Sequence, residues 1–410
     1  MPIVADWVGR AEWLAALVIL LTALALRRSF WTALTAAVKA ALGCLILWWV
    51  AAGPLTSALA ALDSASRQAL GLELVLPVNE LAMLPLLRDL GAAALGIFFL
   101  GGALMLLLVR FLPRAYLFLS GHHSLFMAAL LAGALAALGL RGLALVLAGG
   151  LILALLQAFS PFLAQPLVRR LTGETAVGLA HFSLFSYLCA ATVARLFPRP
   201  SAAPAEPPER AGGITVLLQE PLAATAALSA LLFVLLAAFD RAPGWLSAAL
   251  YQGLLLGLSL ALAAYGARLL LGEWIPLLQT AAERFAPRAI PALDVPALFP
   301  YMAGLLLPGF LASFAAGLLV MAVQAAAGLP VIVPSVVPHY FTGAAAAGFG
   351  AAWGGRKGAL AAAFTNGLII AALAVPLHLL QPAGFATTFS DADFQLVGIL
   401  LGLIRLALTR

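Results

Sequence analysis

The histidines of this chain lie in apolar surroundings, and their chemistry needs an explanation. Four of the five, His122, His123, His181 and His339, occur in SGHHS, LAHFS and PHYFTG, beside aromatic and small residues. A neutral imidazole both donates and accepts a hydrogen bond, so it suits recognition of a hydroxyl-rich ligand in a dry pocket. The alternative is that each histidine caps a helix or bonds to a nearby carbonyl group. We assign such an inert, interfacial role to His378.

Acidic residues occur in proline-rich segments of the same chain. Asn79 and Glu80 lie between two prolines in LPVNELAMLP, and Asp294 lies between prolines in PALDVP. Irregular backbone at membrane depth is tolerated only where protein buries it or water lines it, and in transporters such breaks often hold substrate. The alternatives are a helix cap for Glu80 and a turn for Asp294. For Asp391 and Asp393 in FSDADFQ, a solvated N-cap pair is favoured over a direct site role.

Several histidines with a carboxylate are also a ligand set for zinc. The sequence contains no HExxH, no H-x₃-H and no CxxC. Adjacent residues such as His122 and His123 diverge by about 100° around a helix and seldom bind one ion together. The two cysteines, Cys44 and Cys189, lie in apolar runs and are expected to pack there. We therefore predict no metal site and no cofactor.

The composition indicates that these polar residues lie within a membrane protein. Hydrophobic residues make up 64% of the 410 residues, charged residues make up 9%, and the mean hydropathy is +1.09. Soluble proteins carry roughly a quarter charged residues. Unbroken Leu/Ala blocks exclude the alternating pattern of a membrane β-barrel, so we predict an all-α polytopic protein with about eleven transmembrane helices and re-entrant hairpins. The candidate spans lie near residues 12–26, 34–52, 91–112, 122–139, 141–160, 176–196, 221–239, 246–271, 303–328, 343–380 and 395–408.

The basic residues predict the orientation in the membrane. They are scattered at segment ends, which excludes a nucleic-acid partner in spite of the net charge of +6. The positive-inside rule places their loops in the cytoplasm, with the N-terminus outside and the C-terminus inside. The first apolar run, with Asp6 and Glu12, is expected to be retained and not cleaved as a signal peptide. The residues behind this prediction are Arg27, Arg28, Lys39, Arg195, Arg199, Arg210, Arg405 and Arg410.

One proline-rich segment divides the chain. PRPSAAPAEPPERAGG, residues 198–213, predicts a cytoplasmic linker between membrane halves at 1–197 and 214–410. No soluble domain is expected, so any phosphoryl chemistry would need a separate protein. The Gly-rich stretch around GGRKGA lacks the phosphate-loop pattern and predicts a tight cytoplasmic turn carrying Arg356 and Lys357.

An ordered set of segments resembles the membrane-embedded IIC component of the ascorbate-type phosphotransferase system, a bacterial permease family. The set spans most of residues 76–402. The segments are LPVNELA, FLPRAYLFLSGHHSLFMA, AFSPFLAQPLVRRLTGETAVGLAHFS, LLLGEWIP, PALDVPALFPY, VPHYFTG, GGRKGALAAAFTNGLII and TTFSDADFQLVGILLG.

The resemblance implies a homodimeric permease of the bacterial inner membrane, with a substrate-carrying core domain and a dimerising scaffold domain. Transport would be an elevator-type movement of L-ascorbate or a related sugar acid, which a separate IIB protein phosphorylates with phosphate from IIA. The sequence departs from this family at SDADFQ and at GAAAAGFGAAW, which leaves room for another sugar acid or a polyol. The implied substrate contacts are His122, His181 and Asp294, with Asn79, Glu80, His339 and Thr342 in family-like hairpins and His123 in a structural or supporting role.

Two other functions remain open at this point. The first is an uncoupled or ion-coupled transporter on the same fold, because no IIA or IIB domain is fused to the chain. The second is an intramembrane enzyme, which stoichiometric zinc in the purified protein would support. We expect a transport subunit that is not itself an enzyme.

Overall fold

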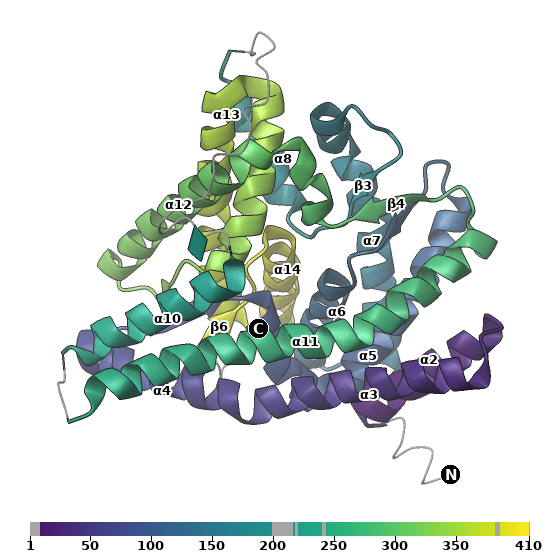
Figure 1. The fold of residues 1–410 in the computed structure, drawn as a ribbon, viewed down its shortest axis with the longest axis horizontal. Helices are drawn as coiled ribbons and strands as arrows, with labels where there is room; N and C mark the ends of the chain where they lie inside the picture. Colours follow the sequence, from purple (N-terminus) through teal and green to yellow (C-terminus); the bar gives the residue numbers. More distant parts are fainter. Residues whose placement is uncertain (1–8, 199–215, 218–219, 240–242, 382–385, 410) are drawn as a thin grey trace.

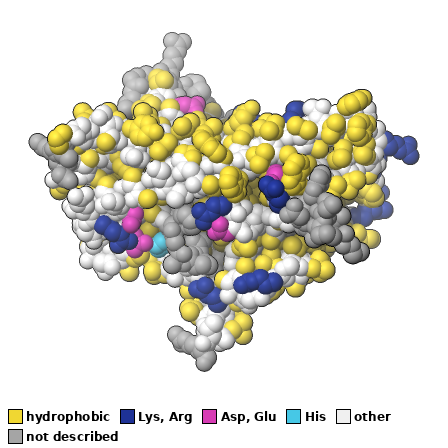
Figure 2. Space-filling view, turned by 90° about the horizontal axis from the view of Figure 1, so that it is seen from below, with side chains coloured by type: hydrophobic (Ala, Val, Ile, Leu, Met, Phe, Trp, Pro, Cys, Tyr) yellow, Lys and Arg dark blue, Asp and Glu magenta, His cyan; other side chains and the backbone are white. Residues whose placement is uncertain are grey.

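Helices make up most of the computed structural model, which describes residues 9–198, 216–217, 220–239, 243–381 and 386–409. The predicted linker at 198–213 therefore lies outside the described residues, apart from Pro198. Many large hydrophobic side chains are exposed, as a membrane protein requires, and Figure 2 shows them covering much of one face. Within the described chain, six helical stretches are long and apolar enough to cross a membrane: Phe30–Leu70, Asn79–Phe111, Gly142–Thr172, Trp245–Phe285, Ala303–Ala326 and Val336–Leu380.

The helices form two layers, which we call the scaffold layer and the core layer (Figure 1). In the scaffold layer, small residues let helix backbones approach closely, as membrane helices favour. A Cβ atom on Gly43 would meet the Gly266 carbonyl oxygen at 2.5 Å, so α3 and α11 pack backbone to backbone there. The scaffold layer contains α2 (Ala11–Ala25), α3 (Phe30–Ala52), α4 (Pro54–Leu70), α10 (Pro221–Ala237) and α11 (Trp245–Phe285).

The core layer takes helices from both predicted halves of the chain. The scaffold layer does so as well, so neither layer corresponds to one predicted half. The division of the chain at 198–213 stays a prediction. The core layer contains α5 (Asn79–Phe111), α6 (Gly121–Ala137), α7 (Gly142–Thr172), α8 (Leu184–Ala194), α12 (Leu306–Ala326), α13 (Val336–Leu380) and α14 (Ala392–Leu408), with two 3₁₀ helices, η1 (Val295–Tyr301) and η2 (Ala303–Leu305).

Six short strands correct the all-α prediction. They form two three-stranded parallel sheets, in the orders β5-β1-β6 and β2-β4-β3. Three of the strands fall at the proline-rich segments that the sequence indicated as irregular, and the other three, at 116–118, 178–179 and 387–388, were not indicated. Pairing satisfies the backbone groups of all six away from water. They are β1 (Leu74–Pro77), β2 (Tyr116–Phe118), β3 (Gly178–Leu179), β4 (Ile290–Leu293), β5 (Val331–Ile332) and β6 (Thr387–Thr388).

Each strand leads directly into a helix, and the ends of the two sheets meet inside the protein. The order is β1–α5, β2–α6, β3–α8, β4–η1, β5–α13 and β6–α14. His123 after β2 lies 3.9 Å from Asp391 after β6, so the carboxyl ends of the two sheets face each other. The predicted spans at 122–139, 176–196 and 395–408 are therefore wrong as complete crossings. Their helices begin at these strand ends within the molecule.

Two long helices are broken at the positions where their backbone leaves the helical conformation. In α5 the break is at Leu90, and in α13 it is at Gly354 and Gly355. Beyond the second break α13 folds back on itself, because a Cβ atom on Gly350 would meet Ala362 Cβ at 2.4 Å. The turn predicted at GGRKGA is thus confirmed as the tip of a helical hairpin.

The first and last described helices end beside different neighbours, and the orientation that the basic residues predict stays a prediction. The start of α2 packs beside Gly91, where a Cβ atom would meet Ala11 Cβ at 3.1 Å. The end of α14 carries Arg405, which with Asp89 lines one cavity of about 750 Å³.

Candidate functional site

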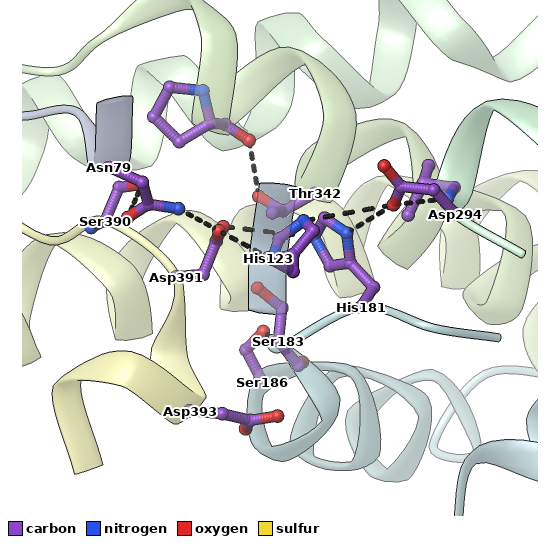
Figure 3. A network of polar contacts seen from close by, with 12 residues as sticks. Asn79, His123, His181, Ser183, Ser186, Asp294, Thr342, Ser390, Asp391 and Asp393 are labelled. Atoms are coloured by element: carbon purple, nitrogen blue, oxygen red, sulfur yellow. Dashed lines mark hydrogen bonds and ion pairs between the residues drawn. The ribbon is translucent and has the colours of Figure 1, made fainter. Parts of the chain in front are cut away.

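Three sequence-predicted residues meet where strands β2, β3 and β4 end. Asp294 is the N-cap residue of η1 and accepts a hydrogen bond from the backbone N–H of Val295 at 2.7 Å. Its Oδ2 lies 2.9 Å from His122 Nε2, and its Oδ1 lies 2.8 Å from His181 Nδ1. The pairing of β2 and β3 with β4 produces this arrangement, since parallel strands end at the same edge. Figure 3 shows Asp294 facing His181.

A second carboxylate, Asp391, approaches the same histidines from the other sheet. Asn79 holds it by donating a hydrogen bond from Nδ2 to Asp391 Oδ2, while its Oδ1 accepts from the backbone N–H of Ser390 at 2.8 Å (Figure 3). Asp391 is only 3% exposed. The solvated N-cap predicted for Asp391 is therefore wrong, and the FSDADFQ segment brings this carboxylate into the site.

Two imidazole nitrogens in this cluster are buried without a hydrogen-bond partner. They are His123 Nδ1 and His181 Nε2. Each lies 3.9 Å from an Asp391 carboxylate oxygen, beyond hydrogen-bond distance. A ligand oxygen between imidazole and carboxylate could bond to both. Because buried polar atoms are almost always paired, these two nitrogens beside a carboxylate make this the candidate position for a ligand.

Asp393 caps a different helix from the one predicted. Its two carboxylate oxygens accept hydrogen bonds from the backbone N–H groups of Leu184 and Phe185, each at 2.9 Å. These groups form the first turn of α8, where unpaired N–H groups attract a negative charge. Asp393 thereby fixes the segment that carries His181.

The electrostatics of the cluster come from carboxylates, imidazoles and helix N-termini. No Lys or Arg contacts Asp294 or Asp391 among the described residues. The N-termini of α5, α6, α8, η1, α13 and α14 point toward this region and offer partial positive charge. The His122 side chain is 40% exposed and that of Asp294 21%, against 4% for His123 and His181. His123, not His122, is therefore the deeper of the pair, and solvent reaches the cluster from the His122 side.

Aromatic rings hold the imidazoles in place. His123 stacks on Phe394 with ring centroids 5.7 Å apart, and His181 stacks on Tyr187 at 5.8 Å. The two imidazoles themselves meet edge to face at 4.0 Å. This packing fixes the ring orientations before a ligand arrives.

Two predicted site residues, His339 and Thr342, belong to a separate buried network. His339 Nδ1 lies 2.8 Å from Ser313 Oγ, and Thr342 Oγ1 accepts a hydrogen bond from Asn366 Nδ2 at 2.8 Å. Ser186 Oγ donates to Asn366 Oδ1 at 2.7 Å and completes the network. The structure does not bring these residues into the histidine–aspartate cluster.

Glu80 and His378 make no hydrogen bond to the cluster in the described structure, but Glu80 lies close enough to interact with the charges of His122, Asp294 and Asp391. Glu80 is in the first turn of α5 and is half-buried, next to Asn79. His378 lies 3.1 Å from Glu73 Oε1 and lines the 750 Å³ cavity. His378 is thus not part of the histidine–aspartate cluster, and its inert, interfacial role stays a prediction.

The family of the chain follows from a match across nearly its whole length. Residues 7–393 match EIIC-GAT, described as the PTS system sugar-specific permease component, where PTS is the phosphotransferase system. The chain belongs to the EIIC-GAT family. A search of curated proteins found no match. The chain is therefore a permease component, a multi-pass transport subunit of the bacterial inner membrane that acts with IIA and IIB proteins on a sugar.

The resemblance to the ascorbate-type family is thus wrong. The phosphotransferase permease function and the soluble partners that it implied are confirmed in general form, but this permease matches the galactitol-type family instead. The departures at SDADFQ and GAAAAGFGAAW were the signal against the ascorbate family.

The same side chains of the permease form two sets with the spacing of metal ligands. They are His122, His123 and Asp294, and His123, His181 and Asp391. Neither set was visible in the sequence, because its members come from segments far apart in the chain. The predicted absence of a metal stays a prediction, and metal analysis tests it below.

Proposed function

We propose that this permease binds a neutral sugar alcohol or sugar at the histidine–aspartate cluster and delivers it to a phosphorylated IIB protein. The observation that carries the proposal is the pair of unpartnered nitrogens, His123 Nδ1 and His181 Nε2, facing Asp391. A hydroxyl group donates to a carboxylate and accepts from an imidazole N–H at the same time. A polyol supplies several such groups in a row.

The charges of the cluster favour a neutral substrate over a sugar acid. A ligand carboxylate would lie near Asp294 and Asp391, with no Lys or Arg contacting either of them in the described chain. Two like charges about 4 Å apart repel by roughly 4 kcal/mol at an effective dielectric constant of 20. This repulsion gives a physical reason for abandoning ascorbate.

The proposed substrate contacts are His122, His123, His181, Asp294 and Asp391. Asn79 positions Asp391 through its side-chain hydrogen bonds. Glu80 remains a candidate contact from the first turn of α5. His339 and Thr342 are excluded from the proposed site because their own network already pairs them.

We further propose that transport moves the core layer against the scaffold layer in a homodimer. The 750 Å³ cavity supports this idea, because α4 of the scaffold and α5, α6, α13 and α14 of the core line it together. Such a boundary cavity is a natural route for solvent to one side of the site.

Sugar phosphorylation by reconstituted components tests the proposed function. Proteoliposomes with the permease, IIA, IIB and a phosphoryl donor are offered galactitol, other hexitols, hexoses and ascorbate. We expect phosphorylation of a neutral polyol or sugar and none of ascorbate. Preferred phosphorylation of a sugar acid, or accumulation of free substrate driven by an ion gradient without IIB, would reject the proposal.

A further inference from the structure

Five basic residues gather where the α13 hairpin turns, near the end of α8 at the top of Figure 1. We call them the hairpin-tip patch: Arg169, Arg170, Arg195, Arg356 and Lys357. All five are exposed. They come from three segments, because Arg169 and Arg170 end α7, Arg195 caps α8, and the other two follow the glycine turn.

The patch is built on a rigid support. The Trp353 ring contacts two guanidinium groups, with Arg170 at 3.8 Å and Arg195 at 4.1 Å from its centroid. Arg170 Nε also donates to the Ala352 carbonyl oxygen at 2.9 Å. Gly355 has φ 60° and ψ −153°, a conformation that essentially only glycine adopts. These contacts order the cations before any partner binds, which lowers the cost of docking.

Most cations of the patch have no ion-pair partner among the described residues. Arg169, Arg170, Arg195 and Lys357 form no ion pair with a carboxylate within the described part of the chain. Some other exposed basic residues do form ion pairs, as Lys39 does with Glu273 at 2.9 Å. A cluster of ordered, unneutralised cations favours an anionic partner.

One helix, α8, connects the patch to the candidate sugar site. Helix α8 begins three residues after His181 and runs 11 residues to Ala194, next to Arg195. At 1.5 Å per residue this length is about 16 Å. Asp393 fixes the first turn of α8, so the helix links the site and the patch as one rigid element.

We propose that the hairpin-tip patch is the docking surface for the phosphorylated IIB protein. This inference rests on the proposed function and adds the place where the partner binds. The phosphoryl group of IIB carries up to about two negative charges, so the patch attracts it during approach, before the group is transferred to the sugar. The patch thus holds IIB on the face toward which α8 leads from the sugar.

Charge reversal in the patch tests the docking surface. Arg195→Glu and Lys357→Glu are made singly and together in the full-length permease, and the KM for phosphorylated IIB is measured in sugar phosphorylation at several salt concentrations. Arg114→Glu, an exposed arginine before β2, is the matched control for unspecific electrostatic attraction. We expect the double variant to raise the KM by at least about tenfold and to flatten its salt dependence, with the control near wild type.

Galactitol affinity without IIB is measured in parallel, and it should not change in any of these variants. A KM within twofold of wild type in the double variant, or an equal effect in Arg114→Glu, would overturn the docking proposal. Failure of the wild-type permease to support phosphorylation with any IIB would instead reject the proposed function.

Discussion

Two buried histidine networks in this permease differ in one respect that separates binding from structure. In the network of His339, Ser313, Asn366, Thr342 and Ser186, no buried side-chain atom lacks a hydrogen-bond partner, and no carboxylate takes part. In the histidine–aspartate cluster, two buried imidazole nitrogens have no partner and two carboxylates face them.

This difference shows that a histidine buried in a membrane protein is not by itself a sign of a substrate site. The histidines of the two networks have similar sequence surroundings, since His339 in PHYFTG and His181 in LAHFS both lie beside aromatic and small residues. A paired imidazole stabilises the fold, because losing its hydrogen bonds leaves buried polar atoms unsatisfied. An unpaired imidazole next to a carboxylate is free to form hydrogen bonds with a ligand.

Asp294→Asn should produce the largest effect on binding. The amide replaces one acceptor by a donor, so it cannot accept from both His122 and His181. Hydrogen bonds to charged groups contribute about 1.5–3 kcal/mol, so galactitol affinity should fall by roughly 10- to 150-fold. Isothermal titration of the purified protein between pH 5.5 and 8 measures this at every pH. Retained binding with loss of pH-driven accumulation would point to a proton-coupled transporter and would reject the role given to Asp294.

Paired alanine variants sharpen the contrast between the two networks. His181→Ala should weaken galactitol binding by roughly 1–3 kcal/mol, and its stability should fall as well, because a buried ring bonded to Asp294 is removed. His339→Ala should lower the free energy of unfolding by about 2 kcal/mol, because a cavity and unpaired Ser313 and Asn366 atoms remain. Its binding should stay near wild type in the folded fraction. Thermal melts and titration on both variants decide, and exchanged phenotypes would contradict the assignment.

Asp393→Asn should have a smaller effect on both quantities. The carboxylate holds the first turn of α8 and acts on the substrate only through His181. We expect about 1 kcal/mol lost from stability and a similar loss from binding, the usual size of a helix-cap effect. Asp89→Asn, at an exposed side chain outside the cluster, is the control. An unchanged galactitol affinity in Asp393→Asn would show that α8 does not position His181.

Removal of divalent metal should have no effect. Both sets of metal-like spacing use residues that we assign to the sugar. Elemental analysis should find zinc, manganese and nickel far below one per chain, and EDTA should leave binding unchanged. Stoichiometric metal lost together with activity would favour the intramembrane enzyme that the sequence left open.

Composition and proline spacing are local signals, so the sequence predicted a membrane protein with broken segments. It placed Asp294, His122 and His181 together only through a resemblance to a family that proved wrong. Asp391 was missed because an acid before an apolar run is usually a solvated cap, and only the pairing of β1 with β6 brings it beside Asn79. The short strands gave no recognisable period, so the inner ends of α6, α8 and α14 could not be located.

A structure of the permease with bound galactitol tests the central claim most directly. We predict ligand density next to Asp294, with one hydroxyl oxygen within hydrogen-bond distance of both His181 Nε2 and Asp391, closing the 3.9 Å gap between them. The aspartate and histidine side chains should keep their present rotamers. Density confined to the 750 Å³ cavity beside Arg67 and Arg405, with the imidazole nitrogens still unpartnered, would contradict the account.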